Sequence, residues 1–300
     1  MLSGKVWPNG EVWAGHLPSK GSQLGLSNLH NNHNAPPGSK GISRNGKRKV
    51  RQGAYLVETE AGKRCMSFLT CTLPGGSSDD AYQACRLWGE IVRRFIQELR
   101  RELLRRGLSG DVVGCTEIQP KRFATTGEVW PHLHVVFRGK KRAGPWLISK
   151  KRANLMWARC VNAVLGIPME DLAASTRIET IRTKKSVAQY LGKYLSKGED
   201  DCQEYLEKNP GIKLPTQWHH CNHGLNQQIK ADTVKLRPKT AAFVIQLLMS
   251  TNPGAKLFTT ILPHGDDDPW GAPIGYVGML DPPLKKTIVE YNRLRNEEAI

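Results

Sequence analysis

The sequence has no hydrophobic run long enough to cross a bilayer, since the longest, AAFVIQLLM, covers only residues 241–249. The first residues, MLSGKVWPNGEVWAG, also lack the apolar segment of a signal peptide. Seven cysteines, an odd number without a repeating spacing, argue against a disulfide framework and favour a reducing compartment. We therefore expect a cytoplasmic protein.

Acidic residues are scarce, with 27 Asp and Glu against 44 Lys and Arg, so the formal net charge is +17. Such a balance favours a polyanionic partner, nucleic acid before membrane, and predicts binding that weakens as salt rises. The 300 residues are 39% hydrophobic, which is enough for a globular core.

Three regions differ in composition. Residues 1–62 are rich in Gly, Asn, Ser, His and Pro without a sustained period of 2 or 3.6, and we expect a flexible basic arm there. Within it, GISRNGKR (41–48) nearly fits a phosphate-binding loop but lacks the required Ser or Thr. Residues 63–199 carry regular patterns and form the expected core domain. Residues 200–300 are predicted to be an extension packed on that core.

The core region alternates between strand and helix patterns. Strands are predicted at 64–74, 112–119, 131–139 and 175–183, and helices at 79–107, 149–166 and 187–197, with a loop at 121–130. The order predicts an α+β fold on the split β-α-β plan of ferredoxin-like and RRM-like domains. Its antiparallel sheet would carry helices on one face and leave the other face open for a ligand.

A candidate metal site lies in the two central strands. His132 and His134 are two apart in a strand and so share a face. If the neighbouring strand places Glu117 on the same face, the three form a 2-His-1-carboxylate set that suits Mn²⁺ or Mg²⁺. The alternatives are exposed strand histidines and a surface carboxylate opposite Lys121 or Arg122.

The segment KSVAQYLGKYLSK (185–197) places Tyr190 and Tyr194 on one ridge of a predicted helix, with Lys193 and Lys197 on a second ridge beside it. A phenol is a weak nucleophile at neutral pH unless a metal or a lysine lowers its pKa. Tyrosines at this spacing are also common packing residues.

The three patterns together, in this order, resemble those of the HUH endonucleases, in particular two-tyrosine rolling-circle replication initiators of single-stranded DNA phages and plasmids. The strand motif of the family matches FLTCTLP (68–74), the His-hydrophobic-His motif matches 132–134, and the YxxKY motif matches 190–194. The preceding carboxylate of the family matches Glu117. The resemblance covers about residues 64–197.

The resemblance implies metal-dependent nicking and rejoining of single-stranded DNA at a replication origin, with a 5′-phosphotyrosine intermediate and a free 3′-OH for a host polymerase. Two tyrosines would allow successive cleavages, and Lys193 would stabilise charge at the phosphate or phenolate. No helicase motif follows, so a host helicase would unwind the DNA in the cytoplasm of the host cell.

Further DNA contacts are predicted at Thr70 and Thr72, which share a strand face, at Lys197, and at Trp130, which could stack on a base or belong to the core.

Other hypotheses about the function stay open. An HUH-type transposase or relaxase fits less well, because such transposases tend to use one tyrosine and such relaxases three histidines. A non-catalytic nucleic-acid-binding module of the same fold is the alternative from another class. The segment QWHHCNHG (217–224) lacks the second pair of ligands of a zinc finger, and a DNA-facing loop is the preferred interpretation.

Overall fold

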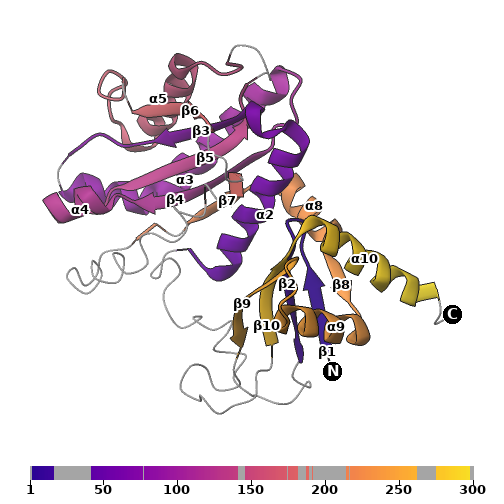
Figure 1. Cartoon of the computed structure of the whole chain (residues 1–300). Helices are drawn as coiled ribbons and strands as arrows, with labels where there is room; N and C mark the ends of the chain where they lie inside the picture. Colours follow the sequence, from indigo (N-terminus) through magenta and orange to yellow (C-terminus); the bar gives the residue numbers. More distant parts are fainter. Residues whose placement is uncertain are drawn as a thin grey trace. The chain divides into compact units, whose positions relative to one another are not determined.

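The computed structural model describes residues 2–16, 42–76, 78–140, 146–173, 175–181, 187–188, 191, 214–215, 217–261 and 275–297. The chain divides into a large unit, Ala35–Gln227, and a small unit that joins Met1–Asn34 to Gln228–Ile300. Each unit holds one five-stranded sheet, and all the strand pairs in both sheets are antiparallel (Figure 1). The prediction of an α+β fold is therefore confirmed.

The sheet of the large unit has the strand order β6-β3-β5-β4-β7. The elements of this unit are α2 (Arg44–Ala61), the 3-10 helix η1 (Lys63–Cys65), β3 (Met66–Cys71), α3 (Ser78–Arg105), β4 (Val112–Ile118), α4 (Pro120–Thr126), β5 (Pro131–Arg138), α5 (Lys150–Leu165), β6 (Thr176–Thr180) and β7 (His219–Cys221). Four strands and two helices were predicted from the sequence at these places. The predicted helix 187–197 lies mostly outside the described residues.

Helices α3 and α5 cover one face of this sheet. Ser149 begins α5 by accepting a hydrogen bond from the backbone N–H of Arg152, and Gly166 ends it with φ at 71°. The rings of Trp88 and Phe95 on α3 both lie edge-on to Trp157 on α5, with centroids 5.8 and 5.3 Å apart. All three are fully buried among apolar side chains of the sheet, so this layer is the hydrophobic core of the unit.

Helix α2 packs on the opposite face, so the prediction of helices on one face only is wrong. A Cβ added at Gly53 of α2 would lie 2.9 Å from the Val113 side chain, which points away from α3 and α5. Val50, Ala54 and Val57 recur at helical spacing and are buried. The stripe was missed because basic residues surround it and Gly46 and Gly53 interrupt it.

The expected flexible arm at 1–62 therefore contains α2, and it also contains two strands of the small unit. The boundary between the two units lies inside α8 (His223–Ala231). The other elements of the small unit are β1 (Leu2–Val6), β2 (Glu11–His16), β8 (Val234–Leu236), α9 (Pro238–Met249), β9 (Ala255–Ile261), β10 (Gly275–Leu280) and α10 (Pro282–Glu297). The sheet order is β8-β1-β2-β10-β9, which joins both ends of the chain.

The small unit has its own core of Val6, Val12, Val244, Leu280 and neighbouring apolar residues. It differs from the expected extension at 200–300, because its sheet is completed by the first residues of the chain. The segment 121–130, expected to be a loop, also contains regular structure, because α4 runs from Pro120 in its first turn to the C-cap Gly127.

Candidate functional site

Strands β4 and β5 bring a carboxylate and an imidazole into direct contact. Glu117 lies opposite His132 in the antiparallel register, so both side chains and that of His134 lie on the same face. The Nε2 atom of His134 is 2.6 Å from Oε2 of Glu117. Glu117 is 6% exposed and His134 is 4% exposed, so the pair is shielded from solvent.

Strand β3 fixes the His134 ring from its other side. Thr70 is the register partner of His134, and its hydroxyl oxygen is 3.2 Å from Nδ1. A hydroxyl that donates to Nδ1 leaves the proton of the neutral ring on Nε2, where it points at Glu117. The Phe68 ring stacks on the imidazole, with centroids 5.3 Å apart and planes inclined by 20°. Thr70 was predicted from the sequence as a DNA contact, and neither Thr70 nor Phe68 was predicted to support the histidine.

His132 provides a second imidazole with a free ligand atom. Its Nε2 is buried and has no hydrogen-bond partner within the described parts of the chain. Burial, and to a lesser degree His134 and Arg122, lowers the pKa of His132 from 6.5 to about 3. The ring is therefore neutral at physiological pH, which is the form that binds a metal ion. The His132 and His134 ring centroids are 6.0 Å apart.

These donors fit Mn²⁺ or Mg²⁺ in type, since two imidazoles and one carboxylate leave coordination positions open. They are not gathered around one point, because no group of three or more His, Cys, Asp or Glu among the described residues has an arrangement that could hold a metal ion. The Glu117–His134 contact of 2.6 Å is a hydrogen-bond length, shorter than the ~3 Å between adjacent ligands of an octahedral ion with bonds of about 2.1 Å. Metal binding here would thus require loss of the Nε2 proton.

The predicted nucleophiles and their neighbouring lysines, Tyr190, Lys193, Tyr194 and Lys197, lie outside the described residues. Three residues of the same segment are described, namely Val187, Ala188 and Leu191, and all three are buried. The backbone N–H of Val187 donates to Oε2 of Glu58 at 2.8 Å, which ties the start of this segment to α2.

Two other residues that were predicted to contact DNA, Trp130 and Thr72, make contacts within the large unit. Trp130 is 1% exposed, its indole N–H donates to Glu128 at 2.9 Å, and the guanidinium of Arg122 lies 4.1 Å from the centre of its ring. A buried ring cannot stack on a base, so of the two readings of Trp130 the core tryptophan is correct. The backbone carbonyl of Thr72 accepts a 2.8 Å hydrogen bond from the indole of Trp157 and so anchors α5 at the end of β3, while a contact of the Thr72 side chain with DNA stays a prediction.

The histidines of QWHHCNHG do not cluster. His219 and His220 are consecutive in β7 and therefore point to opposite faces of the sheet. His220 is buried, its Nε2 is 3.3 Å from the Thr116 hydroxyl, and burial lowers its pKa to about 3. The prediction that this segment is a loop is wrong, because it forms an edge strand and the start of α8, while its contact with DNA stays a prediction.

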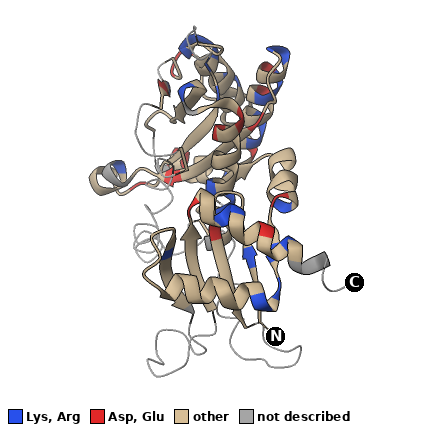
Figure 2. Ribbon diagram, turned by 45° about the vertical axis from the view of Figure 1, so that its right-hand side comes forward, with Lys and Arg blue, Asp and Glu red and all other residues tan. Residues whose placement is uncertain are grey.

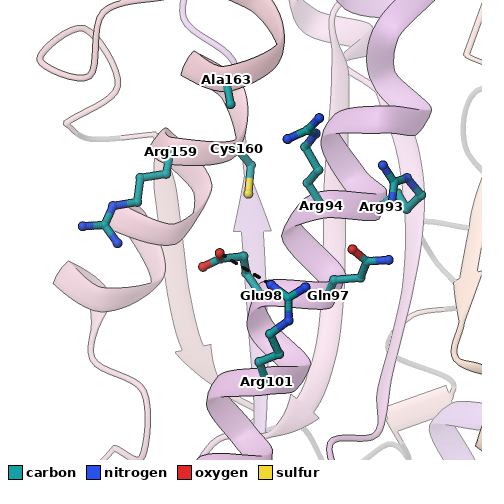
Figure 3. A pocket seen from close by; sticks show the side chains of 8 residues that line it. All are labelled: Arg93, Arg94, Gln97, Glu98, Arg101, Arg159, Cys160 and Ala163. Atoms are coloured by element: carbon teal, nitrogen blue, oxygen red, sulfur yellow. Dashed lines mark ion pairs between the residues drawn. The ribbon is translucent and has the colours of Figure 1, made fainter.

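An open hollow of about 350 Å³ lies on the other side of the sheet, between α3 and α5 (Figure 3). Arg93, Arg94, Arg101 and Arg159 line it, and the thiol of Cys160 lies between the two helices. Burial, assisted by the charge of Glu98, raises the pKa of Cys160 to about 11, so the thiol is not a nucleophile at neutral pH. The hollow holds exposed positive charge, and Lys and Arg also lie on elements of the small unit (Figure 2).

In comparisons with known proteins, no family model, no curated protein and no solved structure matches the chain. Within the described residues, no helix is both long and apolar enough to span a membrane.

Proposed function

We propose that this chain nicks and rejoins single-stranded DNA as a rolling-circle replication initiator of the HUH endonuclease type. The buried contact between Glu117 and His134, with the unpartnered Nε2 of His132 on the same face, is the observation that carries the proposal. These three residues are the ones that the family resemblance selects as metal ligands.

The strand order supports the same assignment. In the large unit, β3, α3, β4, β5, α5 and β6 follow one another along the chain, and their strands are ordered β6-β3-β5-β4 in the sheet. This order agrees with the split β-α-β plan, in which the two central strands are not consecutive in sequence, and so supports the proposed core. The central strands β3 and β5 carry Thr70 and the two histidines, as an HUH core would require.

Each residue has a defined part in the proposed reaction. Glu117, His132 and His134 would hold Mn²⁺ or Mg²⁺, which when bound polarises a phosphodiester oxygen. Thr70 and Phe68 orient the His134 ring through the contacts described above. Neither contact depends on the bound ion.

The phenolate oxygen of Tyr190 or Tyr194 attacks phosphorus, and the bond from phosphorus to the 3′ oxygen breaks. The proton lost by the phenol is balanced by the proton that the 3′ oxygen gains. Lys193 stabilises the charge that develops at the phosphate, and reversal of the same step rejoins the strand.

The partners follow from the charge and from this chemistry. A net charge of +17 suits a DNA backbone. The single-stranded DNA would come from a replication origin, and a host helicase and a host polymerase would unwind and extend it in the cytoplasm of the host cell.

Covalent labelling tests the proposal. The full chain is incubated with 3′-end-labelled single-stranded fragments of the replicon that encodes it, with Mn²⁺ or with EDTA, and separated on a denaturing protein gel. We expect Mn²⁺-dependent label on the protein that is lost when Tyr190 and Tyr194 are both changed to Phe. Tyr82→Phe on α3 is the matched control and should keep the label.

The other outcomes separate the alternatives. Label that disappears with one single Tyr→Phe change would indicate a one-tyrosine enzyme of the transposase or relaxase kind. DNA binding that is equal in Mn²⁺ and EDTA, with no label under either condition, would contradict the nickase and leave a binding module.

A further inference from the structure

The sheet of the small unit has one face covered by helices and a second face that no described element of the same unit covers. Helices α9 and α10 both pack on the same side, where Val244 of α9 and Ile288 of α10 are buried against Val6, Val12 and Leu280. Because side chains alternate along a strand, the residues between these positions point to the second face.

One row of partners crosses the whole second face. The register joins Lys235 of β8 to Lys5 of β1, Lys5 to Trp13 of β2, Trp13 to Val277 of β10, and Val277 to Thr259 of β9. Lys5, Lys235 and Thr259 are exposed, and Trp13 is half-buried. The indole of Trp13 thus lies on the central strand, and the two lysines of the row lie on the next two strands, β1 and β8.

A second aromatic ring lies at the edge. The register between β9 and β10 shifts at a bulge that contains Phe258, and this side chain is 52% exposed. The ammonium group of Lys256 lies 6.0 Å from the centre of the Phe258 ring. Lys256 is the register partner of Met279 and so lies on the second face, and its contact puts the Phe258 ring beside that face. Strands β2 and β9 are two strand spacings apart, so the backbone positions of Trp13 and Phe258 are ~10 Å apart across the sheet.

The lysines give this face a positive charge, which favours binding of an anion. Lys5 and Lys235 are directly opposite each other, and like charges in such a pair repel. The one carboxylate that the register places on the second face, among the residues described, is that of Glu11. It is 6% exposed and accepts a hydrogen bond from the Asn9 side chain.

We propose that this face of the small unit binds single-stranded nucleic acid, with bases stacked on Trp13 and Phe258 and backbone phosphates on Lys5, Lys235 and Lys256. Exposed rings on an open sheet accept the faces of unpaired bases, which a duplex hides, and flanking cations neutralise the backbone. This site is separate from the proposed nicking site, so either could be absent without the other.

The test is fluorescence anisotropy of a labelled 20-nucleotide oligo(dT) with the full chain in EDTA. Phe258→Ala and Trp13→Ala should each weaken binding about 10-fold, and Trp13→Phe should restore part of the loss. Changing Lys5 and Lys235 to Gln should make the slope of log affinity against log salt less steep by ~0.7 per lysine. Phe243→Ala, an exposed ring on α9, is the matched control and should bind as the wild type does.

Three results would overturn the proposal: wild-type affinity in Phe258→Ala together with Trp13→Ala, an equal loss in Phe243→Ala, or equal competition by a duplex of the same length. Circular dichroism of each variant checks its folding, and Phe258 is exposed enough for its truncation to leave the core intact. Covalent labelling in Mn²⁺ at saturating DNA reports on the nicking site alone, so failure of one proposal is distinguishable from failure of the other.

Discussion

Replacing Glu117 by glutamine removes the negative charge that faces His134 and keeps the size of the side chain. The Nε2–Oε2 contact is 2.6 Å and buried, so it is a charge-assisted hydrogen bond in a site with little solvent screening. A bond of this kind contributes about 1.5–3 kcal/mol, against about 0.5–1.5 kcal/mol for the neutral bond that glutamine can make. We expect Glu117→Gln to lower the free energy of unfolding by ~1–1.5 kcal/mol and the Tm by ~2–6 °C.

The response to Mn²⁺ separates a metal ligand from a structural carboxylate. A ligand at 100 times its Kd stabilises the folded state by about 2.7 kcal/mol, which corresponds to a rise in Tm of ~5–11 °C. If Glu117→Gln weakens metal binding about 100-fold, the same Mn²⁺ concentration stabilises the variant by only ~0.4 kcal/mol, or about 1 °C.

Differential scanning fluorimetry in EDTA and in increasing Mn²⁺ measures both effects. Glu90→Gln is the matched control, because Glu90 lies on α3, on the opposite face of the sheet from the histidines, and pairs with Arg93 and Arg94. We expect it to keep the full Mn²⁺ response. The reasoning is refuted if the wild type shows no Mn²⁺ response, or if Glu117→Gln responds as strongly as the wild type does.

Three more predictions concern the large unit. The folded pKa of His220, about 3, is below its ordinary 6.5, so the unfolded chain binds the extra proton and stability falls as pH drops from about 6.5 toward 3. His220→Gln should remove ~2 kcal/mol of the stability difference between pH 7 and pH 5 in urea titrations, and an unchanged difference would contradict this assignment. Gly114→Ala should lower the free energy of unfolding by ~1–3 kcal/mol, because the new Cβ would lie 2.5 Å from the backbone oxygen of His134, and an unaltered urea midpoint would contradict that packing. Trp130→Ala should cost about 3–5 kcal/mol by the same measurement and leave oligonucleotide affinity unchanged, whereas weaker DNA binding by the folded variant would return Trp130 to the DNA interface.

Much of the secondary structure of the large unit could be predicted from local sequence patterns. The apolar positions of α3 recur at helical spacing and its start and end carry capping signals, so the helix was predicted almost to its ends. The same holds for α5, with Ser149 and Gly166. Strand periodicity alone placed His132 and His134 on a common face, and the structure agrees.

Two features could not be predicted in this way: the pairing of the N-terminal strands with β8 and β10, and the packing of α2 on the sheet of the large unit. β1 and β2 pair with each other as a hairpin at Asn9-Gly10, a local turn signal that was missed, but their outer partners β8 and β10 are more than 200 residues away. No local pattern encodes such a pairing, because the favourable burial exists only after both ends of the chain meet. Helix α2 was missed for a related reason, since its apolar stripe is short and is stabilised by the sheet on which it packs.

The sequence by itself determined which residue types are available for a metal and for DNA: two histidines at strand spacing, a carboxylate in the preceding strand, and an excess of positive charge. Only the tertiary structure decided that Glu117 lies opposite His132 and contacts His134, and that Thr70 reaches the far side of that ring. The physical reason is register. A shift of one residue between β4 and β5 would send Glu117 to the face covered by α3 and α5, and the register is held by burial of both faces of the sheet.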